Sequence, residues 1–254
     1  MPCSTNNYCN RFFHGYIYLY NDSKKKILIF TATYNEKDNI EPLIKSINFY
    51  NSEVNILIID DNSPDLTFKK VEDLKSEYNN IILKVRNSKN GLDTAHKEAY
   101  DFALKNDYDY LITMDADLSH DPSEITNFIK YLDKFPFVIG SRYIEGGRCE
   151  MKGRRLIISK FGNKLIKTIL NINCNEFTTS FRGFNLKKLE NFHLNLVQNK
   201  GYSFFMGTVF EINRLNFTIK EIPITFKDRK MGISKIPKIE ILRTLKNLFL
   251  LYLK

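Results

Sequence analysis

The sequence predicts an α/β protein built on a doubly wound sheet, with helices covering both faces. The first observation behind this prediction is an alternation of short β-branched runs with longer amphipathic stretches, repeated four times. The second is the composition. The 254-residue chain is 43% hydrophobic with only 11 glycines and 7 prolines, so it can bury one full core.

Five runs are interpreted as buried strands because each is short, rich in β-branched and apolar residues, and bounded by turn or charged residues. Between them lie four stretches that repeat apolar residues every three to four positions, as helices packed on a sheet do. The predicted strands are Lys26–Thr33, Val54–Asp60, Ile81–Val85, Tyr110–Asp115 and Phe137–Ser141. The predicted helices are Asn39–Tyr50, Leu66–Tyr78, Thr94–Lys105 and Pro122–Lys134.

The alternation stops after Arg142, and two further helices are expected beyond it. Leu156–Leu170 resembles a basic amphipathic helix, and Lys238–Lys254 places an apolar face opposite lysines and an arginine. For the second helix two interpretations stay open. It lies at a membrane surface or on a partner, or it packs on the protein's own core. Residues 1–23 are interpreted as an extension of unknown role.

The charge balance limits the classes of partner. With 38 Lys and Arg against 29 Asp and Glu, the net charge is +9, which favours nucleic acid, phosphorylated small molecules or an acidic membrane surface. Four scattered cysteines suggest neither a zinc site nor a disulfide framework. No segment reaches the roughly 18 to 20 apolar residues of a membrane-spanning helix. Glycine-rich nucleotide loops are absent, which argues against dinucleotide dehydrogenases and P-loop NTPases.

Polar residues follow the predicted strands at the edge where such sheets bind ligands. Asp115 and Asp117 flank a single residue, so both carboxylates can face one cation, and oxygen ligands suit Mg²⁺ or Mn²⁺. The alternative is an acidic turn in which Ser119 or Asp121 caps the next helix. Basic residues that could bind phosphate lie further along the chain, at Arg142, Arg154, Arg155 and the segment Asp228–Lys235.

Seven motifs occur in a recognisable order, and through them the chain resembles the dolichol-phosphate mannose synthases from about Lys26 to Lys235. The acidic motifs are shared more widely by family 2 glycosyltransferases of the GT-A fold, whereas DADLSH, SRY, SFR and the final basic motif are more specific. The motifs are Ala32–Glu36, Ile59–Asp65, Gly91–Ala95, Met114–His120, Gly140–Tyr143, Ser180–Arg182 and Asp228–Lys235.

The resemblance implies a GT-A domain over 24–235, an extension at 1–23 and an interfacial or partner-binding helix at 236–254. It also implies transfer of mannose from GDP-mannose to dolichyl phosphate with inversion, which supplies the mannose donor for glycosylation and GPI anchors. The nucleoside-binding positions that it implies are Ala32, Tyr34, Glu36, Ile59 and Asp61. The implied diphosphate and metal positions are Asp115, Ala116 and Asp117, with Ser119 completing the metal shell. The implied phosphate-holding positions are Arg142, Arg155, Arg229 and Lys235.

The chemistry of the implied reaction fits this division of roles. The acceptor phosphate is largely ionised near neutral pH, its second pKa being about 6, so no catalytic base is needed. Charge builds on the departing GDP instead, and a divalent ion with fixed guanidinium groups would stabilise it. Asp117, Arg142 and Arg229 are therefore the expected catalytic group.

A dolichyl substrate lies in a membrane. Some family members carry a transmembrane anchor, whereas others depend on small membrane subunits, and this chain resembles the second type. The resemblance therefore implies peripheral recruitment to the cytosolic face of the endoplasmic reticulum, with Leu156–Leu170 as a second interfacial candidate.

Some positions depart from the family pattern and keep other functions open. Asp93 stands where glycine is usual, and Phe205 and Gly207 replace a glutamine and a glutamate. The alternatives are a polyprenyl-phosphate glycosyltransferase that uses a UDP-sugar, and a catalytically weakened scaffold. A nucleic-acid partner is not expected, because no recognition motif accompanies the positive charge.

Overall fold

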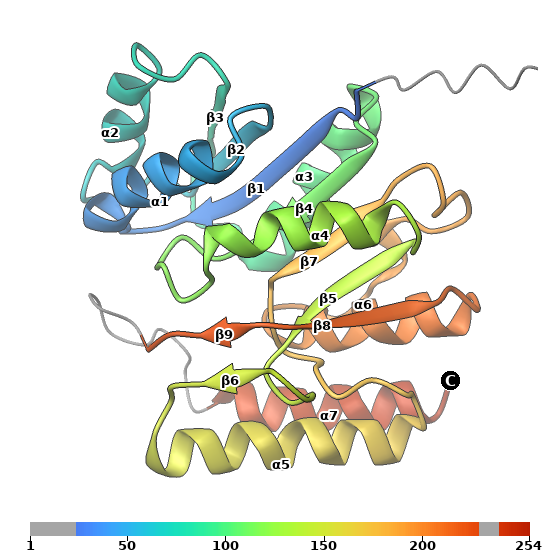
Figure 1. Ribbon diagram of the computed structural model, residues 1–254. Helices are drawn as coiled ribbons and strands as arrows, with labels where there is room; N and C mark the ends of the chain where they lie inside the picture. Colours follow the sequence, from blue (N-terminus) through green and yellow to red (C-terminus); the bar gives the residue numbers. More distant parts are fainter. Residues whose placement is uncertain (1–23, 229–238) are drawn as a thin grey trace, which may run out of the picture.

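A computed structural model describes residues 24–228 and 239–254 of the chain (Figure 1). Its centre is a seven-stranded sheet with the strand order β3-β2-β1-β4-β7-β5-β8, and β6 and β9 form a small second sheet. The strands are β1 Ile27–Thr33, β2 Asn55–Asp60, β3 Ile81–Val85, β4 Tyr110–Thr113, β5 Phe137–Ser141, β6 Arg148–Cys149, β7 Arg182–Asn185, β8 Ile219–Pro223 and β9 Thr225–Phe226. The helices are α1 Lys37–Tyr50, α2 Thr67–Leu74, α3 Leu92–Lys105, η1 Pro122–Glu124, α4 Ile125–Leu132, α5 Gly153–Leu170, η2 Leu194–Leu196, α6 Ser203–Arg214 and α7 Ile239–Tyr252.

The doubly wound mixed sheet is confirmed. All five predicted strands form, and β1 is parallel to both β2 and β4. Alternate residues of β1 serve opposite faces of the sheet. Phe30 packs in a core cluster that includes residues of α3 and α6, whereas Ile29 packs in a cluster that includes residues of α1 and α4. The layers above and below the sheet follow from this period of two.

Four predicted elements end earlier than the sequence suggested, and two of them, the helices predicted to end at Lys134 and Lys254, end two residues sooner, at Leu132 and Tyr252. The fourth strand ends at Thr113 rather than Asp115, because the Asp115 N–H donates to the His120 Nδ1 at 3.1 Å instead of continuing the strand pairing. The second helix ends at Leu74 rather than Tyr78. It begins after Leu66, whose φ of 64° is left-handed, and this conformation separates Leu66 from the helix that was predicted to include it.

The sequence did not predict β7, which lies antiparallel between β4 and β5. Its residues pair Thr113 with Arg182 and Phe137 with Phe184, so one strand joins the two halves of the sheet. As a result, the chain that immediately precedes Arg182 runs along the edge where β4 and β5 end.

Helices α5 and α7 lie side by side below the sheet in Figure 1. The last helix packs on the protein's own core, and its contact with a membrane or a partner stays a prediction. Leu248 and Leu251 of α7 are buried, while Leu242, Leu245 and Phe249 remain exposed. The predicted basic helix forms as α5 and also leaves apolar side chains in solvent. Across 24–228 and 239–254, none of the helices combines the length and apolarity needed to cross a bilayer.

Gly207 lies in a tightly packed part of α6. A Cβ atom at this position would lie 2.3 Å from the Asn199 Oδ1 and 2.9 Å from the Val197 Cγ1. A glutamate here, which is usual in the family that the chain resembles, would therefore require the side chains of Val197 and Asn199 to shift. Asp93 also has a structural contact, because its Oδ1 accepts a hydrogen bond from the Gly201 N–H at 3.0 Å.

Candidate functional site

The carboxyl ends of β1 and β2 form one side of the candidate site. The Thr33 hydroxyl donates to Asp60 at 2.7 Å, and Asp60 also accepts from the Ser63 N–H at 2.8 Å. Asp60 is fully buried, and through these two hydrogen bonds it holds the turn after β2 in place. Within that turn Asn62 adopts a left-handed φ of 52°, a conformation that asparagine tolerates better than most residues.

Asp61 comes next in that turn, and Arg86 from the end of β3 holds it. The guanidinium of Arg86 forms an ion pair with Asp61 and donates to the Thr94 hydroxyl at 2.7 Å and to the Gly91 carbonyl at 3.1 Å. Burial raises the pKa of Asp61 above its ordinary value, although the charge of Arg86 acts in the opposite direction. The sequence motifs assigned no role to Arg86.

The other expected nucleoside positions vary in exposure. Ala32, Tyr34 and Glu36 are half-buried at the end of β1, and the Lys89 Nζ lies 3.9 Å from the centre of the Tyr34 ring. The side chain of Ile59 is fully buried in the core. These nucleoside assignments stay predictions.

The Asp115–Asp117 turn is braced from several sides. The Ser180 hydroxyl donates to Asp115 at 2.6 Å, and the Ser119 hydroxyl donates to Asp117 at 2.6 Å. Behind the turn, His120 is fully buried and stacks on Phe181 with ring centres 4.9 Å apart. Its Nδ1 accepts from the Asp115 N–H, so the neutral ring carries its proton on Nε2, which faces the Thr179 hydroxyl at 3.2 Å.

The donor atoms in this turn fit Mg²⁺ or Mn²⁺. Over the described part of the chain, no three His, Cys, Asp or Glu side chains gather as a ligand set. Asp115 and Asp117 supply two carboxylates, with Ala116 buried between them, and Mg²⁺ commonly uses one or two carboxylates together with substrate phosphates. Ser119 is fully buried and directs its proton to Asp117, so it orients that carboxylate. Its direct place in a metal shell stays a prediction.

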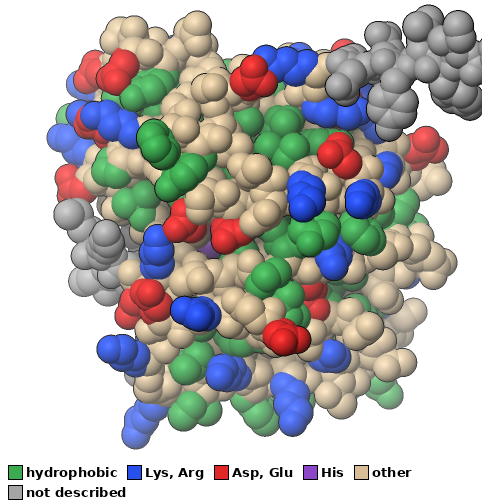
Figure 2. All heavy atoms as spheres, in the orientation of Figure 1, with side chains coloured by type: hydrophobic (Ala, Val, Ile, Leu, Met, Phe, Trp, Pro, Cys, Tyr) green, Lys and Arg blue, Asp and Glu red, His purple; other side chains and the backbone are tan. Residues whose placement is uncertain are grey.

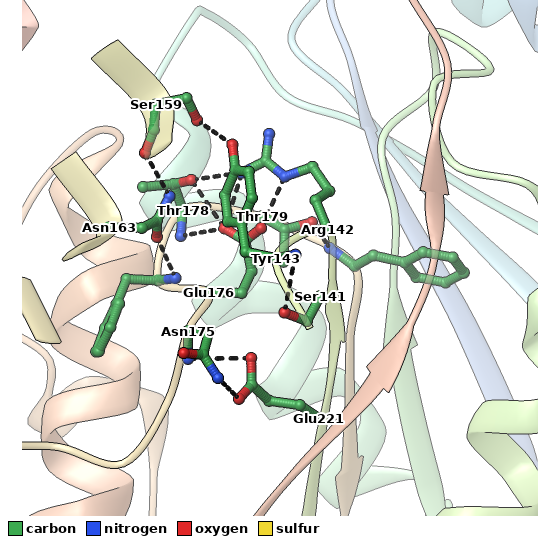
Figure 3. A network of polar contacts seen from close by, with 12 residues as sticks. Ser141, Arg142, Tyr143, Ser159, Asn163, Asn175, Glu176, Thr178, Thr179 and Glu221 are labelled. Carbon is green, nitrogen blue, oxygen red and sulfur yellow. Dashed lines mark hydrogen bonds and ion pairs between the residues drawn. The ribbon is translucent and has the colours of Figure 1, made fainter. Parts of the chain in front are cut away.

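Arg142 is bound by a buried carboxylate that the sequence analysis missed (Figure 3). Its Nε and Nη2 donate to the two oxygens of Glu176 at 2.7 and 2.8 Å, and Nη2 also donates to the Thr178 hydroxyl at 2.8 Å. The Nη1 group has no hydrogen-bond partner among residues 24–228 and 239–254. Burial opposes the charge on Arg142, but the charge of Glu176 outweighs it and raises the pKa of Arg142.

One connecting segment, residues 176–182, links the arginine to the acidic turn. Glu176 binds Arg142, Thr179 meets His120, and Ser180 binds Asp115. Arg142 and Glu176 lie 34 positions apart, so no spacing rule could pair them. The available signal was a lone carboxylate in a run of aromatic and hydroxyl residues between an amphipathic helix and the SFR motif.

The remaining basic candidates are less well defined. Arg155, near the start of α5, has a side chain 54% exposed and lies 3.8 Å from Asp228. Arg229 and Lys235 lie outside the described residues. Just before them, the Lys227 N–H donates to the Ser119 carbonyl at 3.0 Å, and its Nζ donates to Asp121 at 2.7 Å. The chain that leads to Arg229 is thus attached to the acidic turn.

The family follows from the comparison with known sequences. Residues 28–192 match Glycosyl transferase family 2. The chain is 32% identical over 215 residues to the polyprenol monophosphomannose synthase of Mycolicibacterium smegmatis, covering 84% of this chain and 81% of that protein. The chain therefore belongs to glycosyl transferase family 2.

Solved structures define the fold more closely. Glucosyl-3-phosphoglycerate synthase from Mycobacterium tuberculosis, in complex with Mn²⁺, UDP and glucosyl-3-phosphoglycerate, has a TM-score of 0.64 at 14% identity, covering 91% of this chain and 79% of that one. A mannosyltransferase from Pyrobaculum calidifontis, in complex with GDP-Man and Mn²⁺, has a TM-score of 0.53 at 18% identity, covering 78% and 55%. At these identities the likeness concerns the fold alone, and it confirms the predicted GT-A fold.

Proposed function

We propose that this chain transfers mannose from GDP-mannose to the phosphate of a polyprenol, with inversion at the anomeric carbon and with Mg²⁺ or Mn²⁺ as cofactor. The observation that carries the proposal is the segment 176–182, which binds Arg142 at one end and the Asp115–Asp117 turn at the other. The Nη1 of that arginine has no hydrogen-bond partner among residues 24–228 and 239–254. The named relative is a polyprenol monophosphomannose synthase, and this supports mannose and a polyprenyl phosphate as the reactants.

The metal, when bound, supplies Lewis-acid stabilisation of the diphosphate leaving group. In this proposal Asp115 and Asp117 hold the ion, and the hydroxyls of Ser180 and Ser119 keep the two carboxylates in position. His120 orients the backbone of the same turn through its Nδ1. The two carboxylates and the backbone of the turn are therefore held in position before substrate binds, as electrostatic catalysis requires.

Arg142 binds phosphate oxygens through its Nη1 in this proposal. Glu176 and Thr178 occupy the other donors, so the guanidinium is fixed in one orientation before an anion arrives. The ionised acceptor phosphate attacks without a base. Arg155, Arg229 and Lys235 would add positive charge around the diphosphate or the acceptor.

The proposal extends to the nucleoside and to the cellular site. Asp61, held by Arg86, lies with Ala32, Tyr34 and Glu36 at the proposed guanosine position.

Dolichyl phosphate is the acceptor that the resemblance implies. The resemblance also implies that the protein is peripheral to the endoplasmic reticulum membrane, on its cytosolic face. The exposed apolar residues of α5 and α7 support contact with a membrane surface or with small membrane subunits.

An assay of purified protein in detergent tests the proposal. Dolichyl phosphate and undecaprenyl phosphate would each be offered with GDP-mannose, UDP-glucose and UDP-N-acetylglucosamine, with Mg²⁺, with Mn²⁺ or with chelator. We expect a metal-dependent mannolipid from GDP-mannose. Asp117→Asn should lower turnover about a hundredfold or more, because it removes a charge that the metal requires.

Asp73→Asn, an exposed change in α2, is the matched control and should keep full turnover. Transfer from a UDP-sugar alone would reassign the donor and contradict the GDP-mannose proposal. No transfer with any donor, from protein that is folded and binds GDP, would instead favour the scaffold alternative.

A further inference from the structure

A second basic site lies beside Arg142. A pocket of about 910 Å³ opens between the loop after β5 and the C-terminal half of α5. Arg142 and Tyr143 line one side, and three lysines of α5, Lys160, Lys164 and Lys167, line the other. None of the lining residues is acidic.

The three lysines of this pocket, unlike Arg142, have no acidic partner among the described residues. Within the described residues, Lys160, Lys164 and Lys167 have no carboxylate within ion-pairing distance, and Lys167 donates instead to the Asn175 side chain at 2.8 Å. The backbone N–H and the side-chain amide of Asn175 in turn donate to the two oxygens of Glu221 (Figure 3). A concave surface with one sign of charge concentrates counter-ions, so the pocket is suited to an anion.

The other lining groups indicate more than a bare phosphate. Two exposed asparagine amides in the loop after α5, and a threonine hydroxyl near the end of α5, can form hydrogen bonds with hydroxyl groups of a ligand. The volume lies in the range of sites that hold a small organic ligand. A phosphorylated polyol matches both the charge and these neutral polar groups. These groups are Thr168, Asn171 and Asn173, whereas the amides of Asn163 and Asn175, which also line the pocket, are bonded within the protein.

The position of the pocket favours a lipid as the source of this ligand. Ile157 and Phe161 lie one turn from the basic residues on the same helix, and their exposed fractions are 67% and 66%. Figure 2 shows Lys and Arg side chains mixed with hydrophobic ones over this lower part of the molecule. Lysines beside exposed apolar side chains suit the boundary between headgroups and acyl chains.

We propose that this pocket binds the phosphorylated polyol headgroup of an anionic membrane lipid, of the phosphatidylinositol or phosphatidylglycerol type. The inference goes beyond the proposed mannosyl transfer and does not rest on it. The bound lipid would seat α5 on the bilayer and bring the surface next to Arg142 to the depth at which a polyprenyl phosphate lies.

Vesicle binding by the full chain, without donor or acceptor, tests the site. Phosphatidylcholine vesicles with and without phosphatidylinositol would be sedimented with wild-type protein and with the pocket variant Lys160→Gln/Lys164→Gln/Lys167→Gln. Each lysine near an anionic surface contributes about fivefold to affinity, so we expect a loss of roughly a hundredfold on the phosphatidylinositol vesicles.

The matched control removes the same number of charges elsewhere, at Lys69, Lys105 and Lys134, which are exposed residues in α2, in α3 and after α4. It should retain nearly full binding. Equal losses in the two variants would reduce the effect to net charge and overturn the proposal, as would unchanged binding by the pocket variant. If the pocket variant melts early, Lys164→Gln alone, an exposed change, should still lose about fivefold.

Two further arms identify the source of the anion. If glycerol phosphate stabilises wild-type protein but not the pocket variant, while vesicles show no preference for phosphatidylinositol, the ligand is soluble and the lipid proposal fails. If the pocket variant loses affinity only for polyprenyl phosphate in neutral micelles, the pocket belongs to the acceptor. Neither of these two outcomes changes which sugar nucleotide serves as donor in the transfer assay. Failure of the lipid-binding proposal can therefore be distinguished from failure of the proposed mannosyl transfer.

Discussion

Glu176 is the residue that fixes the direction of the Arg142 guanidinium. Both side chains are almost entirely buried, so removing the negative partner leaves an uncompensated charge in the interior. We expect Glu176→Gln to cost about 3–5 kcal/mol of stability and to lower both the melting temperature and the turnover.

Measurements of turnover distinguish a role of Glu176 in positioning Arg142 from an effect on folding alone. At a temperature where the Glu176→Gln variant is folded, turnover should stay low, while Glu176→Asp, which keeps the charge, should recover part of it. A folded Glu176→Gln variant with wild-type turnover would show that Arg142 does not need this partner.

His96 gives the stability a pH dependence. It lies among the rings of Phe30, Phe204 and Phe205, and burial lowers its pKa to about 3 from an ordinary 6.5. The unfolded chain therefore binds a proton below pH 6.5 that the folded chain does not. The contribution of neutral His96 to the free energy of unfolding is fully present above pH 6.5 and is lost progressively as the pH falls below 6.5.

At pH 5 this loss should amount to about 2 kcal/mol relative to pH 7. His96→Leu removes the group, so the fall in free energy of unfolding between pH 7 and pH 5 should shrink by about that amount. His120, which is also buried with a lowered pKa, is present in both proteins and cancels in the difference. Equal pH slopes for wild type and variant, measured by urea titration, would contradict the assignment.

At the scale of elements, α7 offers a pair of adjacent residues with opposite surroundings. Leu248 is 2% exposed and Phe249 is 61% exposed. Leu248→Asp should lower the melting temperature strongly, because it buries an unpaired charge. Phe249→Asp should leave the melting temperature nearly unchanged but weaken binding to vesicles. A Phe249→Asp protein that binds vesicles as well as wild type would argue against α7 as a membrane contact.

The elements also show where sequence periodicity is informative. The five predicted strands were recognisable because they are rich in apolar and β-branched residues, and all but β3 are mostly buried. By contrast, β7 has the sequence RGFN, which contains no β-branched residue, and it is a strand because its neighbours supply pairing on both sides. The pairing of Arg142 with Glu176 depends on β7, so it could not be predicted before that strand was known.

At the scale of the whole molecule, the proposed donor site predicts selective stabilisation by ligand. GDP with Mn²⁺ should raise the melting temperature, since a ligand that binds only the folded state adds RT ln(1 + [L]/Kd) to its stability. GDP with chelator should give a smaller rise, and Asp117→Asn should lose the metal-dependent part. An equal rise with UDP would count against guanosine selectivity, and no rise with either nucleotide would count against the donor site.

The location of the Asp115–Asp117 motif could be predicted from the sequence, but not all of its side-chain partners could. Its place at the sheet edge was predictable, because ligands bind beyond the carboxyl ends of such strands. The support that Ser180 gives to Asp115 was not predicted, because the two residues meet only through the tertiary fold. The domain limits and the roles of Arg229 and Lys235 stay predictions.

The strand order has a consequence for synthesis on the ribosome. The first four strands of the chain, β1 to β4, can pair among themselves as soon as Thr113 has emerged. The outer side of β4 then stays open until Asn185 has been made, and β5 gains its second partner only with Ile219–Pro223. During that interval the nascent chain carries an unpaired apolar strand, the kind of edge that invites wrong association. Codons that slow translation between residues 113 and 185 would lengthen this exposure, and a chaperone acting in that interval would have most effect.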